Sequence, residues 1–270
     1  MGRGTGETLY ADERTGRPGR PANGTDLPAG RAHPTGDRPG SPGEHRLQEK
    51  MGTTARADRF YNDQVLDHLN PRMQEFVARQ EMFFLSTADA RGECDSTFRA
   101  GPPGFLQVLG ARSLAYPEYR GNGVMASLAN ISENPYVGIL LIDFTRDRIG
   151  LHVNGRARFR TDQEMRMAYP LLPVDPVPGR RPQVWVEVEV IEAYVHCSKH
   201  IPRMVKLPTS AGRAWGTDDT QRKGGDYFGA ARSRQERGLR TEPQPEPEPF
   251  DGWRLPEQHP HADVSGSTAP

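Results

Sequence analysis

The most constraining feature of this sequence is an alternation of apolar and polar residues in its second half. Valines occupy every second position from Val184 to Val190, and Glu187 and Glu189 stand between them. Side chains of a β-strand point alternately to the two faces of a sheet. The segment therefore predicts a long strand whose valines face a core and whose glutamates face water.

Shorter apolar runs bounded by turn residues predict the other strands. These runs cover residues 82–87, 94–99, 105–109, 113–116, 136–143 and 149–159, and helices are expected at 56–69, 71–80, 124–133 and 162–169. At least six strands in antiparallel order with few helices close into a barrel or stack as a sandwich. The expected fold class is mainly β, of the α+β kind.

The two ends of the chain differ in composition from its middle. Residues 1–44 are rich in Gly, Pro, Arg and Thr, and residues 231–270 contain an alternating Pro/Glu run. Such segments bury too little apolar surface to offset the entropy lost on folding. We therefore expect one domain over residues 45–230, between two disordered tails.

The overall composition excludes several classes of protein. The net charge is +0 and the pI is about 7.1, so no basic field favours nucleic acid or a membrane surface. No stretch approaches the roughly 20 apolar residues of a membrane helix. Cys94 and Cys197 have no repeated spacing, which favours a reduced cytosolic protein and leaves one disulfide open. We expect a cytoplasmic protein that binds neither nucleic acid nor membranes.

Two glycine-containing segments are candidates for binding a phosphate group. Arg99 lies in residues 98–105, where an arginine fork could clamp a phosphate and glycines would let backbone approach it. Residues 116–123 lead into the helix expected from Val124, and a helix N-terminus offers free N–H groups to an anion. Asn122 and Arg120 could add a donor and a positive charge. Taken alone, each segment also fits a plain turn without a ligand.

The segment His196–His200 follows the long alternating strand and holds two imidazoles, a thiol and Lys199. A metal site would need further ligands, and no second cluster of Cys and His completes a tetrahedral set. A His/Lys pair at a strand end could instead meet a flavin ring or a phosphate, or be a polar strand terminus. His152, on the strand 149–159, fits a surface histidine. No catalytic triad or pair of carboxylates is evident.

Several short motifs occur in the order typical of one protein family. They are Phe84–Asp89, Arg99–Phe105, Leu114–Pro117, Gly121–Gly123, Asn130, Asn134-Pro135, Val153–Ala157 and His196–Lys199. On these motifs the chain resembles the pyridoxamine 5'-phosphate oxidase-related, FMN-binding split-barrel family. The resemblance implies a six-stranded antiparallel split β-barrel with flanking short helices. It also implies a homodimer with FMN in a groove between the subunits.

The resemblance assigns roles to individual residues of this chain. Contacts to the phosphate and ribityl chain would come from Arg99, Tyr116, Gly121, Asn122, Gly123 and Ser127. The partner subunit would approach the flavin near His152. If the protein is an FMN-dependent oxidoreductase, His196 and Lys199 are candidates for tuning the ring or binding an anionic substrate. No catalytic residue and no metal ligand is assigned.

The chain also departs from the family pattern. Oxidases of the family have a Ser-Arg-Lys run where this chain has Arg120–Gly123, so backbone amides and Asn122 would hold the phosphate more than two cations would. No segment matches the C-terminal part that grips the pyridoxal substrate. The expected function is a flavin-dependent oxidoreductase acting on an unidentified small molecule. The alternatives are a non-catalytic flavin-binding or sensing module, and a split barrel that binds deazaflavin or haem.

Overall fold

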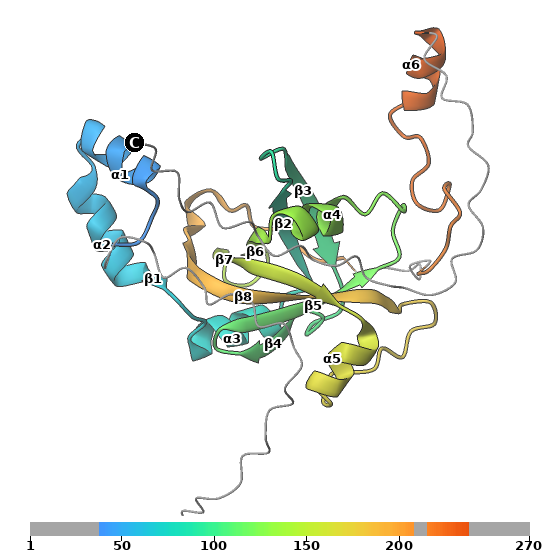
Figure 1. Ribbon diagram of the computed structural model, residues 1–270, viewed down its shortest axis with the longest axis horizontal. Coiled ribbons are helices and arrows are strands. Elements are labelled where there is room, and N and C mark those ends of the chain that lie inside the picture. The colour runs from blue at the N-terminus through green and yellow to red at the C-terminus, as the bar shows by residue number, and fades with distance from the viewer. Residues whose placement is uncertain (1–37, 208–214, 238–270) are drawn as a thin grey trace, which may run out of the picture. The chain divides into compact units, whose positions relative to one another are not determined.

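The computed structural model of the chain describes residues 38–207 and 215–237. Its centre is one antiparallel sheet in which the strands follow the order β3-β2-β6-β7-β8-β5-β4, with β1 paired to β8 (Figure 1). The strands are β1 Val65–Leu66, β2 Met82–Ala88, β3 Cys94–Ala100, β4 Gln107–Gly110, β5 Ser113–Tyr119, β6 Tyr136–Asp143, β7 Ile149–Arg160 and β8 Pro182–His196. The helices are α1 Pro42–Lys50, α2 Thr54–Gln64, α3 Pro71–Ala78, α4 Ala126–Glu133, α5 Asp162–Ala168, α6 Ala230–Glu236 and the 3-10 helix η1 Ser198–His200. The mainly β, α+β class is confirmed.

The sheet rolls up into a split barrel. β2 and β5 are separated by three strands in the sheet, yet the rings of Phe83 on β2 and Tyr116 on β5 lie 5.1 Å apart. Arg99 on β3 similarly reaches Glu118 on β5, with 2.9 Å between Nε and Oε2. Such contacts between distant strands require the sheet to curl around a shared interior.

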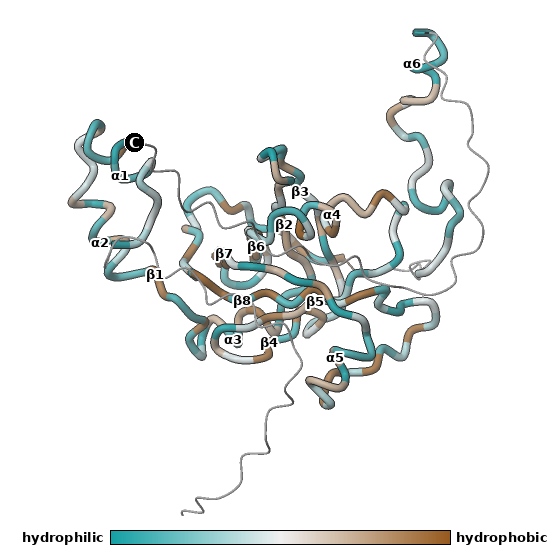
Figure 2. Tube along the Cα trace, viewed as in Figure 1, coloured by the Kyte–Doolittle hydropathy of each residue, from teal (hydrophilic) through white to brown (hydrophobic). Residues whose placement is uncertain are grey.

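Apolar side chains of the inner face fill that interior. Val186 and Val188 are fully buried, as the alternation in β8 predicts, and Leu141 of β6 is fully buried as well. Hydrophobic residues concentrate along the strands, whereas the tip of the β2–β3 hairpin and α6 are hydrophilic (Figure 2). Burial of this continuous core is the main favourable term in folding.

The outer face of β8 corrects one expectation. Glu187 does not face water: it is only 7% exposed. Its carboxylate receives hydrogen bonds from Arg158 and from the hydroxyl of Tyr169, both at 2.9 Å, and pairs with Arg160 at 2.9 Å. Tyr169 directly follows α5, so the segment around this helix covers the outer face that the alternation alone assigns to solvent.

The first predicted helix is shorter than expected, and a short strand replaces its end. α2 stops at Gln64, and Val65 and Leu66 pair with Tyr194 and Ala193 of β8. Pairing with the sheet satisfies backbone groups that the helix would otherwise hold. All seven segments predicted as strands form β2 to β8, and β1 adds one strand to them.

Helix α3 begins where the sequence predicts. The side chain of Asn70 accepts a hydrogen bond from the backbone N–H of Met73 at 2.9 Å, and Pro71 occupies the first helical position. Replacing Asn70 with alanine is expected to lower the free energy of unfolding by about 1 kcal/mol, because this N–H loses its partner. Urea unfolding would measure the change, with Asn62→Ala on the exposed surface of α2 as the control. Equal effects of the two substitutions would contradict the capping role.

The predicted domain limits lie at the edges of the described chain. Most of the predicted tails 1–44 and 231–270 falls outside the described residues, although α1 begins at Pro42 and α6 ends at Glu236. The limits 45 and 230 therefore stay a prediction. Among the described helices, none has the length and apolar character needed to cross a membrane.

Candidate functional site

The loop before α4 exposes backbone at a helix N-terminus. Strand β5 continues to Tyr119, three residues beyond its expected end, and α4 starts at Ala126. Met125, the residue at the N-cap, has a left-handed backbone (φ 58°) and makes no side-chain capping bond. The first N–H groups of a helix lack partners within it and carry partial positive charge. This end of α4 can therefore accept an anion.

The glycines of this loop leave room for a ligand. A Cβ atom built on Gly121 or Gly123 would meet no atom within 4 Å, and Gly123 has a φ of +83° that only glycine adopts readily. Asn122 closes the turn by accepting a hydrogen bond from the N–H of Val124 at 3.0 Å. The side-chain amide of Asn122 has two N–H donors, and within the described part of the chain neither makes a hydrogen bond.

Arg99 joins this helix to two strands. Its guanidinium donates to Glu118 Oε2 at 2.9 Å and to Ser127 Oγ at 3.3 Å, and Ser127 in turn donates to Asp95 at 3.4 Å. We call Asp95, Arg99, Glu118 and Ser127 the α4 cluster. It brings together β3, β5 and the first turn of α4, so two predicted phosphate ligands, Arg99 and Ser127, are in contact.

The α4 cluster holds its own counter-charge. The side chains of Arg99 and Glu118 are 18% and 14% exposed, so both charges are largely removed from water. Burial raises the pKa of Glu118 above its ordinary value, although the charge of Arg99 opposes this shift. A bound phosphate would therefore compete with Glu118 for the same guanidinium.

Tyr116 lies behind the cluster, in the core. It is fully buried, and its hydroxyl has no hydrogen-bond partner among the described residues. Burial raises the pKa of this hydroxyl, and the negative charge of Glu118 adds to the effect. The hydroxyl stays protonated, and it is an orphaned donor beside the predicted binding region.

The remaining predicted residues gather at the other end of the sheet. His152 Nε2 and His196 Nδ1 lie 3.0 Å apart, and the ring of His152 stacks on Tyr194 with centroids 4.7 Å apart. Burial lowers the pKa of His152, and a positive charge on His196 lowers it further. Lys199 is exposed on η1. His152 and His196 form a contact that the sequence did not predict, the histidine pair.

The α4 cluster and the histidine pair lie far apart in a single chain. Glu118 pairs with Val184 near the start of β8, whereas His152 pairs with Tyr194 near its end. Ten residues of strand extend about 33 Å. The structure therefore divides the predicted site residues into two separate groups.

Sequence reasoning missed the carboxylates of the α4 cluster. Asp95, Thr97 and Arg99 occupy alternate positions of β3, so they share one face of the strand. Glu118 likewise shares a face with Tyr116 on β5. The alternation places Asp95 on the same face of β3 as Arg99, but no local pattern indicates that β5 continues past Tyr116 and brings Glu118 to Arg99.

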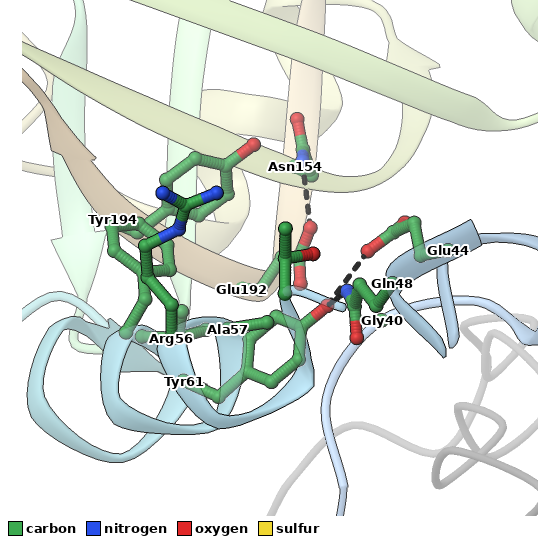
Figure 3. Close-up of a pocket in the computed structure, with 12 residues that line it drawn as sticks. Gly40, Glu44, Gln48, Arg56, Ala57, Tyr61, Asn154, Glu192 and Tyr194 are labelled. Atoms are coloured by element: carbon green, nitrogen blue, oxygen red, sulfur yellow. Dashed lines mark hydrogen bonds between the residues drawn. The ribbon is translucent and has the colours of Figure 1, made fainter. Parts of the chain in front are cut away.

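A separate cavity of about 600 Å³ lies between α1, α2 and the outer face of β7 and β8 (Figure 3). Tyr61 and Tyr194 line it with Glu44 and Glu192; Gln48 donates to the hydroxyl of Tyr61 at 2.6 Å. A second cavity of about 140 Å³ adjoins the loop 102–107 and Trp185. Neither cavity includes a predicted site residue. The loop before α4 thus lies outside both of them.

Comparisons with known proteins identify the barrel segment. Residues 69–197 match the family model described as pyridoxamine 5'-phosphate oxidase. A comparison with curated proteins found no match.

The similar solved structures are distant in sequence. A Lactobacillus delbrueckii protein named for pyridoxamine 5'-phosphate oxidase is 17% identical over 48% of this chain and 95% of its own, with a TM-score of 0.36. HupZ of Group A Streptococcus is 15% identical over 45% of this chain and 89% of its own, with a TM-score of 0.32. An F420 reductase is 16% identical over 44% of this chain and 94% of its own, with a TM-score of 0.32. Residues 69–197, just under half of the chain, are therefore assigned to the pyridoxamine 5'-phosphate oxidase family.

Proposed function

We propose that this protein binds FMN and acts as a flavin-dependent oxidoreductase on a small organic molecule. The observation that carries the proposal is the uncapped N-terminus of α4, next to Arg99 and Ser127, inside the segment that matches the family. These groups supply what a phosphate monoester needs: backbone N–H donors, a hydroxyl and a guanidinium. When bound, FMN would supply the hydride chemistry, while the protein binds and orients it.

The residues of this chain fit such a cofactor in specific ways. The open space at Gly121 and Gly123 lets a phosphate approach the backbone, and Asn122 retains amide donors beside it. The orphaned hydroxyl of Tyr116 offers one further donor in the neighbourhood. Glu118 partly neutralises the positive charge of Arg99, so backbone N–H groups would supply much of the binding free energy of the phosphate.

Mass spectrometry of the ligand released from native protein tests the cofactor. We expect FMN, together with flavin absorbance that bleaches on reduction. A haem Soret band or release of F420 would instead support a different cofactor in the same barrel. A colourless protein that takes up no added FMN would reject the proposal. Reduction by NAD(P)H without turnover of any carbonyl or imine substrate would favour a flavin-sensing module.

We further propose that two copies of the chain complete each site. One cofactor would meet the α4 cluster of one copy and the histidine pair of the other, which accounts for their separation along β8. Homodimers of this kind are symmetric, so both sites of a dimer would be built alike.

Mixing two binding-deficient variants tests this arrangement. Arg99→Gln and His152→Ala are each expected to weaken FMN binding in their homodimers. In a mixed dimer, one of the two sites receives both substitutions and the other receives neither. Tight binding at about half of the sites in the isolated mixed dimer is therefore expected. Failure of the isolated mixed dimer to regain tight binding would contradict a shared site.

A further inference from the structure

A segment outside the family region lies against the candidate phosphate loop. Residues 215–229, which we call the strap, follow the barrel in sequence and precede α6; Figure 1 shows them in orange beside the loop that leads to α4. The ammonium of Lys223 donates to the carbonyl oxygen of Gly121 at 2.9 Å. This contact joins residues 102 positions apart, so only the fold brings them together.

The strap is fixed by aromatic and backbone contacts. The ring of Trp215 packs edge-on against Tyr119 with centroids 5.0 Å apart, and the guanidinium of Arg180 lies 5.2 Å from the same ring. The backbone at Gly179 lies so close to the strap that a Cβ on Gly179 would be 2.6 Å from the carbonyl oxygen of Trp215. A Cβ on Gly216 would likewise be 2.9 Å from the carbonyl oxygen of Gly179. Trp215 therefore anchors the strap at the end of β5, directly before the loop.

The charges on the strap and loop leave a positive balance at this point. Asp218 pairs with Arg120 and lies 3.7 Å from Lys223, so one carboxylate holds two cations. An ammonium has three donors, and the contacts to Gly121 and Asp218 occupy two of them at most. The side chain of Lys223 is 31% exposed. Arg120, Asp218 and Lys223 together thus carry one net positive charge, and these two contacts leave one donor of the Lys223 ammonium unused.

We infer that Lys223 is a phosphate-binding residue of this site, supplied by the strap rather than by the barrel. The inference rests on the proposed function and extends it. The loop Arg120–Gly123 has no lysine of its own, and Lys223 places an ammonium against the backbone of that loop. An ammonium is an effective point charge for phosphate, and the strap holds this one against the loop that leads to the N-terminus of α4.

Titration of flavin-free, full-length protein with FMN and with riboflavin tests the inference, because the two ligands differ only in the phosphate. Lys223→Gln is expected to weaken FMN binding about tenfold, as loss of one partly exposed charged contact does. Riboflavin binding should not change. Lys223→Arg should retain most of the FMN affinity. The matched control is Arg222→Gln, because Arg222 is 68% exposed and pairs with Asp219 on the strap itself.

A second variant separates the strap from the lysine. Trp215→Ala removes the anchor and leaves Lys223 in the chain, so FMN binding should weaken by a similar factor while riboflavin binding persists. Unfolding midpoints of the variants would check that the barrel stays intact.

The outcomes distinguish this inference from the proposed function. If the wild type binds no FMN, the proposed function fails, and the inference fails with it. If the wild type prefers FMN to riboflavin and Lys223→Gln leaves this preference unchanged, the inference alone is overturned. Equal weakening of both flavins would overturn it too, because Lys223 would then act through folding and not through the phosphate.

Discussion

Replacing Glu187 with glutamine is expected to lower the free energy of unfolding by about 2 kcal/mol at neutral pH. The carboxylate is buried and pairs with Arg158 and Arg160, whose side chains are 22% and 26% exposed. The amide of glutamine preserves the shape and the bond from Tyr169 but removes the charge that both guanidinium groups face. Because those guanidinium groups are partly exposed, water can solvate them in the variant and offset part of the lost stability. The effect is therefore smaller than for a fully buried ion pair.

Urea unfolding measures this effect, and Glu75→Gln is the matched control. Glu75 is exposed on α3, where the same substitution should change the free energy of unfolding by less than about 0.5 kcal/mol. An effect of Glu187→Gln within that range would show that the carboxylate contributes no net stability.

The pH dependence of stability tests whether the ionised carboxylate of Glu187 stabilises the fold. Burial alone would raise the pKa of Glu187, but Arg158, Arg160 and Tyr169 outweigh it and hold the pKa below its ordinary value of 4.5. A carboxyl group with a lowered folded-state pKa stabilises the fold above its unfolded pKa and loses this contribution as the pH falls through the folded value. The difference between wild type and Glu187→Gln should therefore be constant above about pH 5.5 and shrink toward lower pH. A difference that grows on acidification would contradict the assignment.

The same glutamate illustrates how far the sequence determines the fold. The alternation in β8 predicts the strand and its buried valines, because side-chain direction depends only on position along a strand. It cannot predict that the segment around α5 covers the opposite face, since this depends on where a distant segment packs. The helical pattern before β1 failed for a similar reason: pairing of Val65 and Leu66 with β8 ended α2 earlier than local propensity suggests.

The parts of the candidate site that are adjacent in sequence could be predicted, whereas the contacts between distant segments could not. The glycine loop and the N-terminus of α4 are adjacent in sequence, and Arg99 was identifiable from a family motif. Glu118 and Lys223 reach the same region through strand pairing and through the strap, and neither contact has a local sequence pattern. The register of β7 and β8 places His152 opposite Tyr194 and His196 opposite Gly150. The two histidine rings therefore meet diagonally across the strands, and only the register brings them together.

Replacing Arg99 with glutamine is expected to weaken FMN binding about a hundredfold, which corresponds to the loss of a charge-assisted, largely buried contact to phosphate. The guanidinium donates to both Ser127 and Glu118. It is the one positive charge of the α4 cluster, and its contact with Ser127 places it at the first turn of α4. Riboflavin should bind the variant as it binds the wild type, because it has no phosphate. The matched control is Arg91→Gln, at the exposed tip of the same hairpin.

Replacing Glu118 with glutamine should have the opposite effect. The carboxylate neutralises Arg99 in the absence of ligand, so its removal should strengthen FMN binding several-fold and again leave riboflavin unaffected. The double variant Arg99→Gln/Glu118→Gln lacks both charges, and its FMN affinity should match that of Arg99→Gln alone. This pattern would show that Glu118 acts only through Arg99, since the two effects would then not add. If Glu118→Gln instead weakened both flavins, the ion pair would serve the closure of the barrel, and the phosphate would have to be bound elsewhere.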